Sequence, residues 1–516
     1  MTPEGFPKPV AELNPNSFEF ETLPLVKPTG FREYDARWWF GHPAADRPPE
    51  LNAMGVTALG MGLGTVIQER GAGQDIVVGH DFRSYSNHIK NALISGLMAT
   101  GCNVKDIGLA LSPMAYYAQF ALDVASVAMV TASHNNNGWT GVKMGCERPL
   151  TFGPEEMGRL KEVVLEGEWK LADPGSGGGG SYEFIPGFRE TYLANLTADR
   201  EQLGKRIKVV CACGNGTAGA FAPQFLRDLG CDVIELNTDL DHTFPNYNPN
   251  PEDMKMLHAI RDAVLEHNAD VGLGFDGDGD RCGVVDNEGE EIFADKVGVM
   301  LARDISARRP DSQFVVDVKS TGLFHSDPVL QAQGAQTDYW KTGHSYIKRR
   351  VNELGAIAGF EKSGHFFFNR PIGLGYDDGL VTAMAVCDML DRNHGSTMAD
   401  LRRALPLTYG SPTMSPHCAD EEKYDVAQRI REIFEKMKAD GEQLAGHAIV
   451  DLVTVNGIRI TTDDGTWGLV RPSSNAPELV VVVESPVSEA RKRDMFAAMD
   501  SIISGQPEVG EYNQKL

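Results

Sequence analysis

Hydrophobic residues recur along this chain as short unbroken runs, each followed by a polar or glycine-rich turn and then by a helical pattern. Three segments share this order, at residues 75–101, 206–230 and 312–334. Unbroken Val/Ile-rich runs that precede helices are typical of strands buried on both faces of a parallel or mixed sheet. The segments are similar in layout rather than in sequence, so they predict three α/β domains of similar design.

The C-terminal part of the chain has a different pattern. Residues 421–441 place apolar side chains at helical spacing and end at Gly441, a residue suited to a helix C-cap. Residues 456–485 predict strands joined by short turns, and residues 488–505 predict a second helix with Ser488 as its N-cap. The expected fold is α/β, with three similar mixed-sheet α/β domains followed by a C-terminal α+β domain.

Two segments of unusual composition mark domain boundaries. Residues 173–181 (DPGSGGGGS) form a flexible linker, and residues 406–417 are dense in Pro and Ser. From these and the strand patterns we expect four domains, at residues 1–184, 185–290, 291–408 and 409–516.

Composition narrows the class of protein. The chain has 516 residues, 42% hydrophobic and 23% charged, which is typical of a folded globular protein. Its net charge of −24 argues against nucleic acid or a membrane as a partner, since both need a cationic surface. It has no signal-peptide pattern and no apolar run of ~18 residues. Eight cysteines without a C-x-x-C pair predict free thiols, so we expect a cytoplasmic protein.

The most specific motif is VGLGFDGDGDRCGVVD at residues 271–286, in which Asp276, Asp278 and Asp280 alternate with glycines after an apolar run. Alternate carboxylates in a tight turn can point at one centre, and oxygen-only ligation suits Mg²⁺. An EF-hand loop is excluded because Arg281 and Asn287 stand where it needs Gly and Glu. The alternative interpretation is an acidic surface turn.

A second motif, MVTASHNNNGWTGVKMG at residues 129–145, places Ser133 and His134 in a polar turn ahead of Lys143. A hydroxyl beside an imidazole and an amine suits a nucleophile or phosphoacceptor. An Asn-rich hairpin turn without chemistry is the alternative.

Two further stretches carry polar side chains between apolar strands. In GFEKSGHFFF (359–368), Glu361, Ser363 and His365 alternate, so an extended segment would present all three to one polyhydroxylated ligand. In LVRPSSNAPELVVVV (469–483), a guanidinium and hydroxyls suit phosphate binding, from Arg471, Ser473, Ser474 and Asn475. An ordinary loop and a polar hairpin are the respective alternatives.

In this order along the chain, these motifs resemble those of the α-D-phosphohexomutase superfamily, most of all its bacterial phosphomannomutase/phosphoglucomutase group. The resemblance runs from FREYDAR (31–37) to VVVVES (480–485). It includes FPNYNPNPED (244–253), the segments around Lys319 and His344, and GYDDG (375–379). It implies domains arranged around a central cleft. It also implies reversible interconversion of hexose 1-phosphate and hexose 6-phosphate, of mannose or glucose, through an enzyme phosphoserine.

The resemblance also assigns roles. It implies one Mg²⁺ per subunit, held by Asp276, Asp278, Asp280 and the phosphorylated Ser133, with hexose 1,6-bisphosphate as intermediate and activator. The catalytic positions it implies are Ser133, His134, Lys143, Arg37 and His344. The positions it implies for binding the phosphosugar are Tyr34, Arg281, Lys319, Glu361, Ser363, His365, Arg471, Ser473, Ser474 and Asn475.

This sequence departs from the family pattern at three places. Asn136 replaces a proline after Ser-His-Asn, Ala36 and Trp38 replace Ile and Gly near the N-terminus, and Asn475 and Ala476 stand where Thr is common. None of these changes removes a side chain that the chemistry needs. The insertion at residues 38–49 is either a contact surface or a loop, and the sequence does not indicate an oligomeric state.

Three alternative functions stay open at this point. A phosphoglucosamine mutase would share every motif and differ in the sugar. A phosphohydrolase would use Asp276 as its own nucleophile, with Asp278 as the acid two residues on. A sugar-phosphate-binding protein without activity would not need the serine, the carboxylates and Glu361 together.

Overall fold

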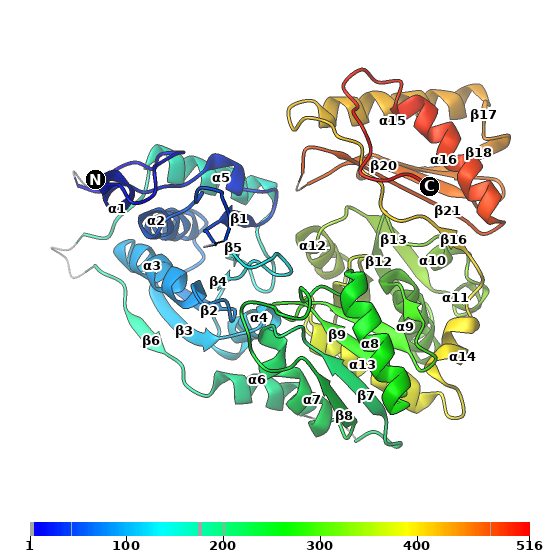
Figure 1. Ribbon diagram of the computed structural model, residues 1–516, viewed down its shortest axis with the longest axis horizontal. Helices are drawn as coiled ribbons and strands as arrows, with labels where there is room; N and C mark the ends of the chain where they lie inside the picture. The colour runs from blue at the N-terminus through cyan, green and yellow to red at the C-terminus, as the bar shows by residue number, and fades with distance from the viewer. Residues whose placement is uncertain (1–4, 43, 174–177, 199, 201, 475) are drawn as a thin grey trace. The chain divides into compact units, whose positions relative to one another are not determined.

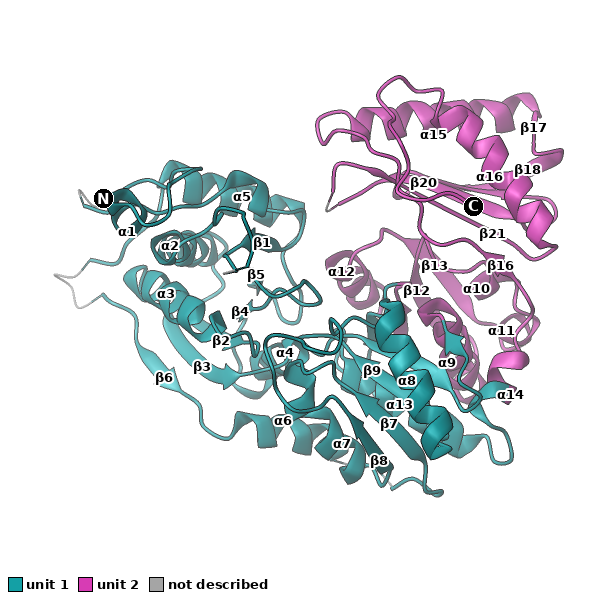
Figure 2. Ribbon diagram, in the orientation of Figure 1, with its two compact units in different colours: residues 1–292, 363–399 teal, residues 293–362, 400–516 magenta. Residues whose placement is uncertain are grey.

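The structure is a computed structural model that describes residues 5–42, 44–173, 178–198, 200, 202–474 and 476–516 (Figure 1). It divides into two compact units (Figure 2). Unit 1 comprises Met1–Ile292 and Ser363–Ala399, and unit 2 comprises Phe293–Lys362 and Asp400–Leu516. Three α/β/α parts with mixed or parallel sheets and a C-terminal part with an antiparallel sheet make up the fold, so the predicted fold class is confirmed. The four domain boundaries stay predictions.

The first part of unit 1 is built on a six-stranded mixed sheet in the order β1-β5-β4-β2-β3-β6. The inner strands β4, β2 and β3 run parallel. Strand β5 is antiparallel to β4, and the edge strand β1 is antiparallel to β5. Its elements are α1 (Phe18–Thr22), η1 (Pro28–Gly30), β1 (Ala36–Trp39), α2 (Ala53–Glu69), β2 (Asp75–His80), α3 (Ser86–Ala99), β3 (Asn103–Leu109), α4 (Ser112–Ala121), β4 (Ser126–Val130), β5 (Trp139–Gly145), α5 (Pro154–Glu166), β6 (Tyr182–Phe184) and α6 (Phe188–Thr197).

Helices α2 and α3 lie close together in this part because glycines face each other. A Cβ atom at Gly60 would come within 2.2 Å of the Leu93 carbonyl oxygen, and one at Gly96 within 2.1 Å of the Thr57 carbonyl oxygen. Helix α2 begins at Asn52, whose side chain accepts the Gly55 amide at 2.8 Å. Apolar side chains of α2, α3 and α5 form one core with the sheet.

The second part of unit 1 has a five-stranded sheet in the order β11-β10-β9-β7-β8. Strands β9, β7 and β8 are parallel. Strand β10 is antiparallel to β9, and the edge strand β11 is antiparallel to β10. Helix α8 packs on β7, β9 and β10, while α13 packs on β10 and α7. Its elements are β7 (Lys208–Ala212), η3 (Thr217–Ala220), α7 (Ala222–Asp228), β8 (Asp232–Leu236), α8 (Met254–His267), β9 (Val271–Phe275), β10 (Cys282–Asp286), β11 (Glu291–Ile292) and α13 (Gly379–Arg392). The short strand β15 (Phe366–Phe368) also belongs to unit 1 but is not part of this sheet.

Unit 2 begins with a parallel layer in which β12 lies between β13 and β14. Helix α12 packs on β12, β13 and β14, and α9 packs on β14. The elements are α9 (Ala294–Arg308), β12 (Gln313–Asp317), α10 (Leu323–Ser326), α11 (Pro328–Ala332), β13 (Gln336–Trp340), α12 (His344–Leu354), β14 (Ala358–Phe360) and α14 (Met398–Arg403), in which the chain re-enters unit 2.

The rest of unit 2 is an antiparallel sheet in the order β16-β21-β20-β19-β18-β17. Helices α15 and α16 pack on it, capped by Gly441 and Ser488 as the sequence predicted. The elements are β16 (Tyr409–Gly410), α15 (Lys423–Asp440), β17 (Gln443–Leu444), β18 (His447–Val453), β19 (Ile458–Thr462), β20 (Trp467–Pro472), β21 (Leu479–Ser485) and α16 (Glu489–Ile503).

Among the described residues, no helix is both long enough and apolar enough to cross a membrane. All eight cysteines are free, and seven of them are buried, as the sequence predicted.

Candidate active site

The central residue of the candidate site is Ser133, which lies in the turn after β4. It is 2% exposed and its φ of +48° is in the left-handed region that non-glycine residues rarely adopt. The Ser133 amide donates to Thr131 Oγ1 at 2.9 Å. The Ser133 hydroxyl donates to Asp276 Oδ2 at 3.0 Å and lies 3.4 Å from His134 Nδ1. The backbone therefore directs the hydroxyl at the first carboxylate of the aspartate motif.

The three aspartates converge at the carboxyl end of β9. Asp276, Asp278 and Asp280 are completely buried, and one oxygen of each lies within 4.8 Å of the others. The close approach to the Ser133 turn requires a glycine, because a Cβ at Gly277 would come within 2.5 Å of the Ser133 carbonyl oxygen. The predicted convergence of these carboxylates is thus present in the structure.

Arg281 joins the two loops. Its Nε lies 3.1 Å from Asp276 Oδ2, and its Nη2 lies 3.4 Å from Ser133 Oγ and contacts His134. Its Nη1 donates to the Ser363 carbonyl oxygen at 3.4 Å. Burial and the cationic Arg281 hold the pKa of His134 well below its usual value.

Lys143 is a buried cation on β5 that faces the aspartates. Its Nζ lies 2.8 Å from Asp278 Oδ2 and also contacts Asp280. Ser112, at the start of α4, donates its hydroxyl to the same Asp278 oxygen at 2.6 Å. A buried amine of this kind is stable only because anionic partners compensate its charge.

The pKa values of these groups follow from burial and from their partners. Burial, reinforced by Asp280 and Asp278, raises the pKa of Asp276 to about 7. Burial also disfavours the ionised form of Asp278, but Lys143 outweighs it and holds the pKa of Asp278 well below its usual range. Burial lowers and the carboxylates raise the pKa of Lys143, with the net result well above its usual value. Of these two carboxylates, Asp276 therefore has the less charge compensation.

The aspartate cluster fits a divalent cation. The Oδ1 atoms of Asp278 and Asp280 are buried and accept no hydrogen bond from any described residue. A buried carboxylate oxygen without a partner is costly, and a bound cation would remove that cost. An all-oxygen donor set is the kind that Mg²⁺ prefers. Asp276, Asp278 and Asp280 are thus the residues that would hold the metal.

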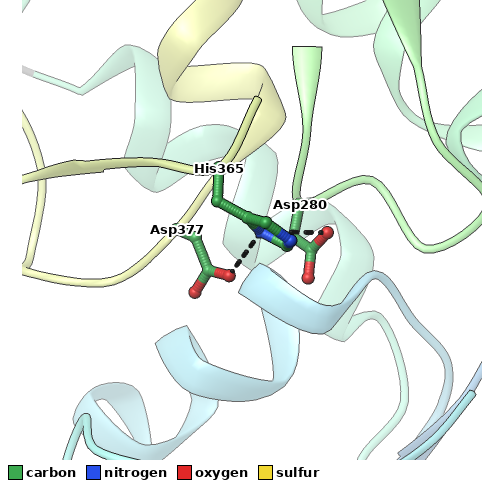
Figure 3. A group of neighbouring side chains, drawn as sticks. All are labelled: Asp280, His365 and Asp377. Atoms are coloured by element: carbon green, nitrogen blue, oxygen red, sulfur yellow. Dashed lines mark ion pairs between the residues drawn. The ribbon is translucent and has the colours of Figure 1, made fainter. Parts of the chain in front are cut away.

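A buried histidine, His365, also lies next to Asp280. Figure 3 shows His365 between Asp280 and Asp377, with its Nδ1 2.9 Å from Asp377 Oδ2 and 3.6 Å from Asp280 Oδ1. Burial would lower the pKa of His365, but Asp280 and Asp377 raise it above its usual value. The two carboxylates therefore favour the charged form of this imidazole, next to the cluster of Asp276, Asp278 and Asp280.

Arg37, on β1, contacts the same turn as Ser133. Its Nη1 donates to the Ala132 carbonyl oxygen at 2.7 Å and contacts the Asn135 side chain, and its Nη2 lies 2.9 Å from Asp35. Tyr34 is buried just before β1. Both predicted residues thus belong to unit 1, and Arg37 touches the serine turn directly.

The insertion at residues 38–49, of which residue 43 lies outside the described residues, packs on the far end of the serine turn. Trp39 is 7% exposed and its ring lies 5.9 Å from that of Trp139. The Arg47 guanidinium lies over both rings, 5.3 Å from Trp39 and 4.8 Å from Trp139. In the described part, the insertion supports the loop that follows Ser133.

Three predicted residues of unit 2 lie at the carboxyl ends of its parallel strands. Lys319 follows β12, His344 follows β13 at the start of α12, and Glu361 follows β14. Ligands bind at this edge of open α/β sheets. The extended segment expected across Glu361, Ser363 and His365 is wrong: β14 ends at Phe360, a turn begins at Lys362, and Gly364 has a φ of +96°.

The predicted phosphate-binding residues belong to the hairpin between β20 and β21. Arg471 and Ser473 are buried, and the Ser473 amide donates to the Glu478 carbonyl oxygen at 2.9 Å, which closes the turn. Ser474 lies in the same turn. The predicted residue Asn475 lies outside the described residues.

The structure brings together most of the predicted residues of unit 1 and adds others that the sequence did not indicate. Unpredicted contacts to the serine turn or the aspartates come from Asp81, Arg83 and Ser112. Asn248, which contacts the His134 carbonyl oxygen, and Asp377, which pairs with His365, lie in segments that the family resemblance includes. A signal for Asp81 and Arg83 was present, since polar residues directly follow the apolar run 75–80. Ser112 had no such signal.

Comparison with known proteins agrees with this geometry. Four family models match successive parts of the chain, namely phosphoglucomutase/phosphomannomutase alpha/beta/alpha domain I at residues 29–170, domain II at 190–289, domain III at 293–409 and the C-terminal domain at 418–502.

Individual relatives span almost the whole chain. A phosphomannomutase/phosphoglucomutase of Pseudomonas putida is 33% identical over 90% of this chain and 94% of its own. A phosphoglucomutase of Neisseria meningitidis is 30% identical over 90% of this chain and 94% of its own. A crystal structure of a phosphoglucomutase/phosphomannomutase family protein from Burkholderia thailandensis matches with a TM-score of 0.81 and 28% identity, covering 94% of this chain and 100% of that one.

Proposed function

Because this chain belongs to the phosphoglucomutase/phosphomannomutase family, we propose that it interconverts the 1-phosphates and 6-phosphates of mannose and glucose through a phosphoserine at Ser133. The observation that carries this proposal is the 3.0 Å contact between the Ser133 hydroxyl and Asp276, inside a buried cluster of three carboxylates. A phosphoacceptor next to a cation-binding cluster is the arrangement that phosphoryl transfer needs.

The proposed reaction has two transfers in opposite directions. Phosphorylated Ser133 gives its phosphoryl group to O6 of a hexose 1-phosphate. The Oγ–P bond breaks, an O6–P bond forms, and the O6 proton leaves to a base. The resulting 1,6-bisphosphate turns around and returns its 1-phosphoryl group to Ser133 Oγ. The O1–P bond breaks, an Oγ–P bond forms, the serine hydroxyl gives up its proton and O1 takes up a proton. Hexose 6-phosphate leaves, and the serine is phosphorylated again.

Residues of unit 1 would stabilise the charge that this reaction moves. A phosphoserine carries about −1.5 to −2 charges. Arg281, 3.4 Å from Ser133 Oγ, and Arg37, which contacts the same turn from β1, would offset it. Bound Mg²⁺ would supply Lewis-acid stabilisation of the transferring group. We assign proton transfer at the sugar hydroxyl to Lys143 or His344.

We assign recognition of the rest of the substrate to unit 2 and its neighbouring segment. Glu361 and Ser363 would bind sugar hydroxyls, as the carboxylate and hydroxyl chemistry suits. Arg471, with the adjoining Ser473, Ser474 and Asn475, would hold the phosphate that is not being transferred. His365 would join Glu361 and Ser363 at the sugar, and Lys319 and, from unit 1, Tyr34 would also contact the phosphosugar.

The first experiment follows ³¹P NMR of the purified protein with Mg²⁺ and a trace of hexose 1,6-bisphosphate. The substrates are mannose 1-phosphate, glucose 1-phosphate and glucosamine 1-phosphate in turn. Growth of a 6-phosphate signal from the first two is expected. Conversion of the glucosamine compound alone would replace the substrate assignment by phosphoglucosamine mutase. Free phosphate alone would indicate a hydrolase, and no change a binding protein.

The serine assignment has its own test. Ser133→Ala removes the phosphoacceptor, so we expect mutase turnover to fall by at least ~10⁴-fold, as for loss of a catalytic nucleophile. Turnover and phosphate incorporation from hexose 1,6-bisphosphate are measured by NMR and intact mass. Ser95→Ala, on the exposed side of α3, is the matched control and should keep both. Turnover near the wild-type value in Ser133→Ala would exclude the phosphoserine mechanism.

A further inference from the structure

The turn that follows β2 carries a buried ion pair with no direct contact to the reacting hydroxyl. Asp81 and Arg83 have side chains that are 1% and 2% exposed, and the Arg83 Nη1 contacts Asp81 Oδ2. Asp81 Oδ1 also accepts the Arg83 amide at 3.1 Å and the Ser86 hydroxyl at 2.5 Å. The Asp81 carboxylate therefore holds the Arg83 guanidinium in one orientation, and its own position is fixed by the Arg83 amide and the Ser86 hydroxyl.

The second terminal nitrogen of this guanidinium, Nη2, donates to backbone carbonyl oxygens of the serine turn. Arg83 Nη2 donates to the Ser133 carbonyl oxygen at 3.0 Å and to the Asn135 carbonyl oxygen at 2.6 Å. One nitrogen thus fixes two carbonyl groups on either side of His134. Hydrogen bonds from a charged donor are stronger than those from a neutral one.

Asp81 reaches the same turn by a second route. Its Oδ2 accepts the Thr131 hydroxyl at 2.9 Å, and Thr131 Oγ1 in turn accepts the Ser133 amide at 2.9 Å. The Asp81–Arg83 pair therefore controls both the N–H and the C=O of Ser133, one through Thr131 and one directly. No other residue of the described chain is shown to hold both groups.

This control matters because the Ser133 backbone is in an unfavourable conformation. A non-glycine residue at φ +48° is in a sparsely populated conformation that persists only where its surroundings enforce it. Asn136 stands where the family pattern has a proline, which would stiffen the turn. Relaxation of Ser133 to an ordinary conformation would turn its hydroxyl away from Asp276, 3.0 Å away.

We propose that Arg83, fixed by Asp81, is a positioning residue that holds Ser133 in the left-handed conformation from which its hydroxyl faces the aspartate cluster. The inference rests on the proposed function, since it assigns a task to residues behind the proposed phosphoacceptor. Displacement of a reacting group by ~1 Å can cost ~100-fold in rate. Arg83 therefore acts on the rate of phosphoryl transfer rather than on substrate affinity.

The test compares Arg83→Gln and Arg83→Lys with the matched control Lys90→Met. Lys90 on α3 forms a similarly buried ion pair with Asp106 on β3 at 2.6 Å, with side chains 5% and 2% exposed. We expect Arg83→Gln to lower kcat by ~100-fold with KM within ~3-fold, and Arg83→Lys to lower it less. Lys90→Met should lower the melting temperature as much or more while keeping kcat near wild type.

Hydrogen exchange supplies a readout that does not depend on activity. Arg83→Gln should lose protection in a peptide covering residues 131–136 but keep it in β3, and Lys90→Met should do the reverse. Thr131→Val, which cuts only the link from Asp81 to the Ser133 amide, serves if the arginine variants fail to fold. It should lower kcat by ~10-fold with unchanged KM.

The outcomes distinguish a failure of the positioning role of Arg83 from a failure of the proposed mutase function. Unchanged kcat and unchanged protection of residues 131–136 in Arg83→Gln would overturn the positioning role. The same kcat loss in Lys90→Met at equal stability would also overturn it. A wild-type enzyme without mutase activity would instead overturn the proposed function, and the exchange experiment would then decide the positioning role by itself.

Discussion

At the residue scale, the candidate site consists of charges that compensate one another out of contact with water. Asp278 is balanced by Lys143, whereas Asp276 keeps a pKa of about 7 because burial and the other carboxylates outweigh Arg281. The carboxylate oxygens left without a hydrogen bond from described residues belong to Asp278 and Asp280. The cluster is thus arranged to gain stability from a bound cation.

This arrangement predicts a Mg²⁺-dependent stability that requires Asp280. For the wild type, Mg²⁺ at about 100 times its Kd should raise the free energy of unfolding by ~2.7 kcal/mol. Asp280→Asn should lose most of that increment, because it removes one anionic ligand. Urea unfolding with Mg²⁺ and with EDTA measures the difference.

The control for this prediction lies on the surface of unit 2. A second group of possible metal ligands there consists of His447, Asp463 and Asp464, whose donor atoms lie close together. The side chain of Asp463 is half-exposed, in contrast to the buried aspartates of the candidate site. Asp463→Asn should leave the Mg²⁺ increment unchanged. An increment of full size in Asp280→Asn would contradict the assignment of the metal site.

At the element scale, the site depends on two loops that approach so closely that only a glycine fits at their contact. The turn after β4 and the turn after β9 meet where Gly277 faces the Ser133 carbonyl oxygen. Both turns follow parallel strands at their carboxyl ends, which is where open α/β sheets form their sites. The alignment of these two strand ends therefore sets the distance from Ser133 to Asp276.

Gly277→Ala should separate the two turns. A Cβ there would lie 2.5 Å from a backbone oxygen, so one loop must shift. We expect kcat to fall by ~100-fold, because the hydroxyl and the carboxylate move apart. Steady-state kinetics and the melting temperature together distinguish this from unfolding.

Gly158→Ala is the matched control. Gly158 lies in α5 with nothing within 4 Å of its added Cβ. Alanine should stabilise the helix by about 0.5–1 kcal/mol and leave kcat unchanged. Normal turnover in Gly277→Ala would show that the close approach has no catalytic role.

At the scale of the whole molecule, each compact unit joins two sheets by buried polar contacts. In unit 2 the joint is Glu484 on β21, which accepts hydrogen bonds from Thr321 at 2.9 Å and from Trp467 at 3.0 Å. Lys296 lies 2.9 Å from the other oxygen of Glu484. Arg459 adds bonds of 2.8 and 2.7 Å to the carbonyl oxygens of Val318 and Ser320.

The Glu484 joint predicts a pH dependence of stability. Burial alone would raise the pKa of Glu484, but Lys296 and the surrounding donors lower it from 4.5 to about 2. A folded-state pKa below the unfolded value gives stabilisation that is complete above pH 4.5 and lost as pH falls towards 2. The shift corresponds to about 3 kcal/mol.

Glu484→Gln should therefore flatten the fall in stability below pH 4.5 and lower stability at pH 7. Urea unfolding of the full chain between pH 3 and 7 measures both effects. Glu421→Gln, an exposed position of the same unit, should keep the wild-type profile. An unchanged profile in Glu484→Gln would show that the joint adds little to the stability of unit 2.

The sequence by itself determined the classes of element and the residues whose chemistry is local. The apolar runs of β2, β7 and β12 and the caps Gly441 and Ser488 follow from periodicity and capping over a few residues. The aspartate motif was visible because its three carboxylates lie within one turn. Its alternation within five residues is enough to make them converge.

Only the tertiary structure decided which residues hold these groups in place. Arg83 and Ser133 are 50 positions apart, and Ser112 and Asp278 are 166 positions apart. Such pairs leave no periodic trace, because each residue satisfies its own local pattern and meets its partner only when strand ends align. For the same reason the alternation of Glu361, Ser363 and His365 misled: an extended segment and a turn through Gly364 share that spacing, and packing selected the turn.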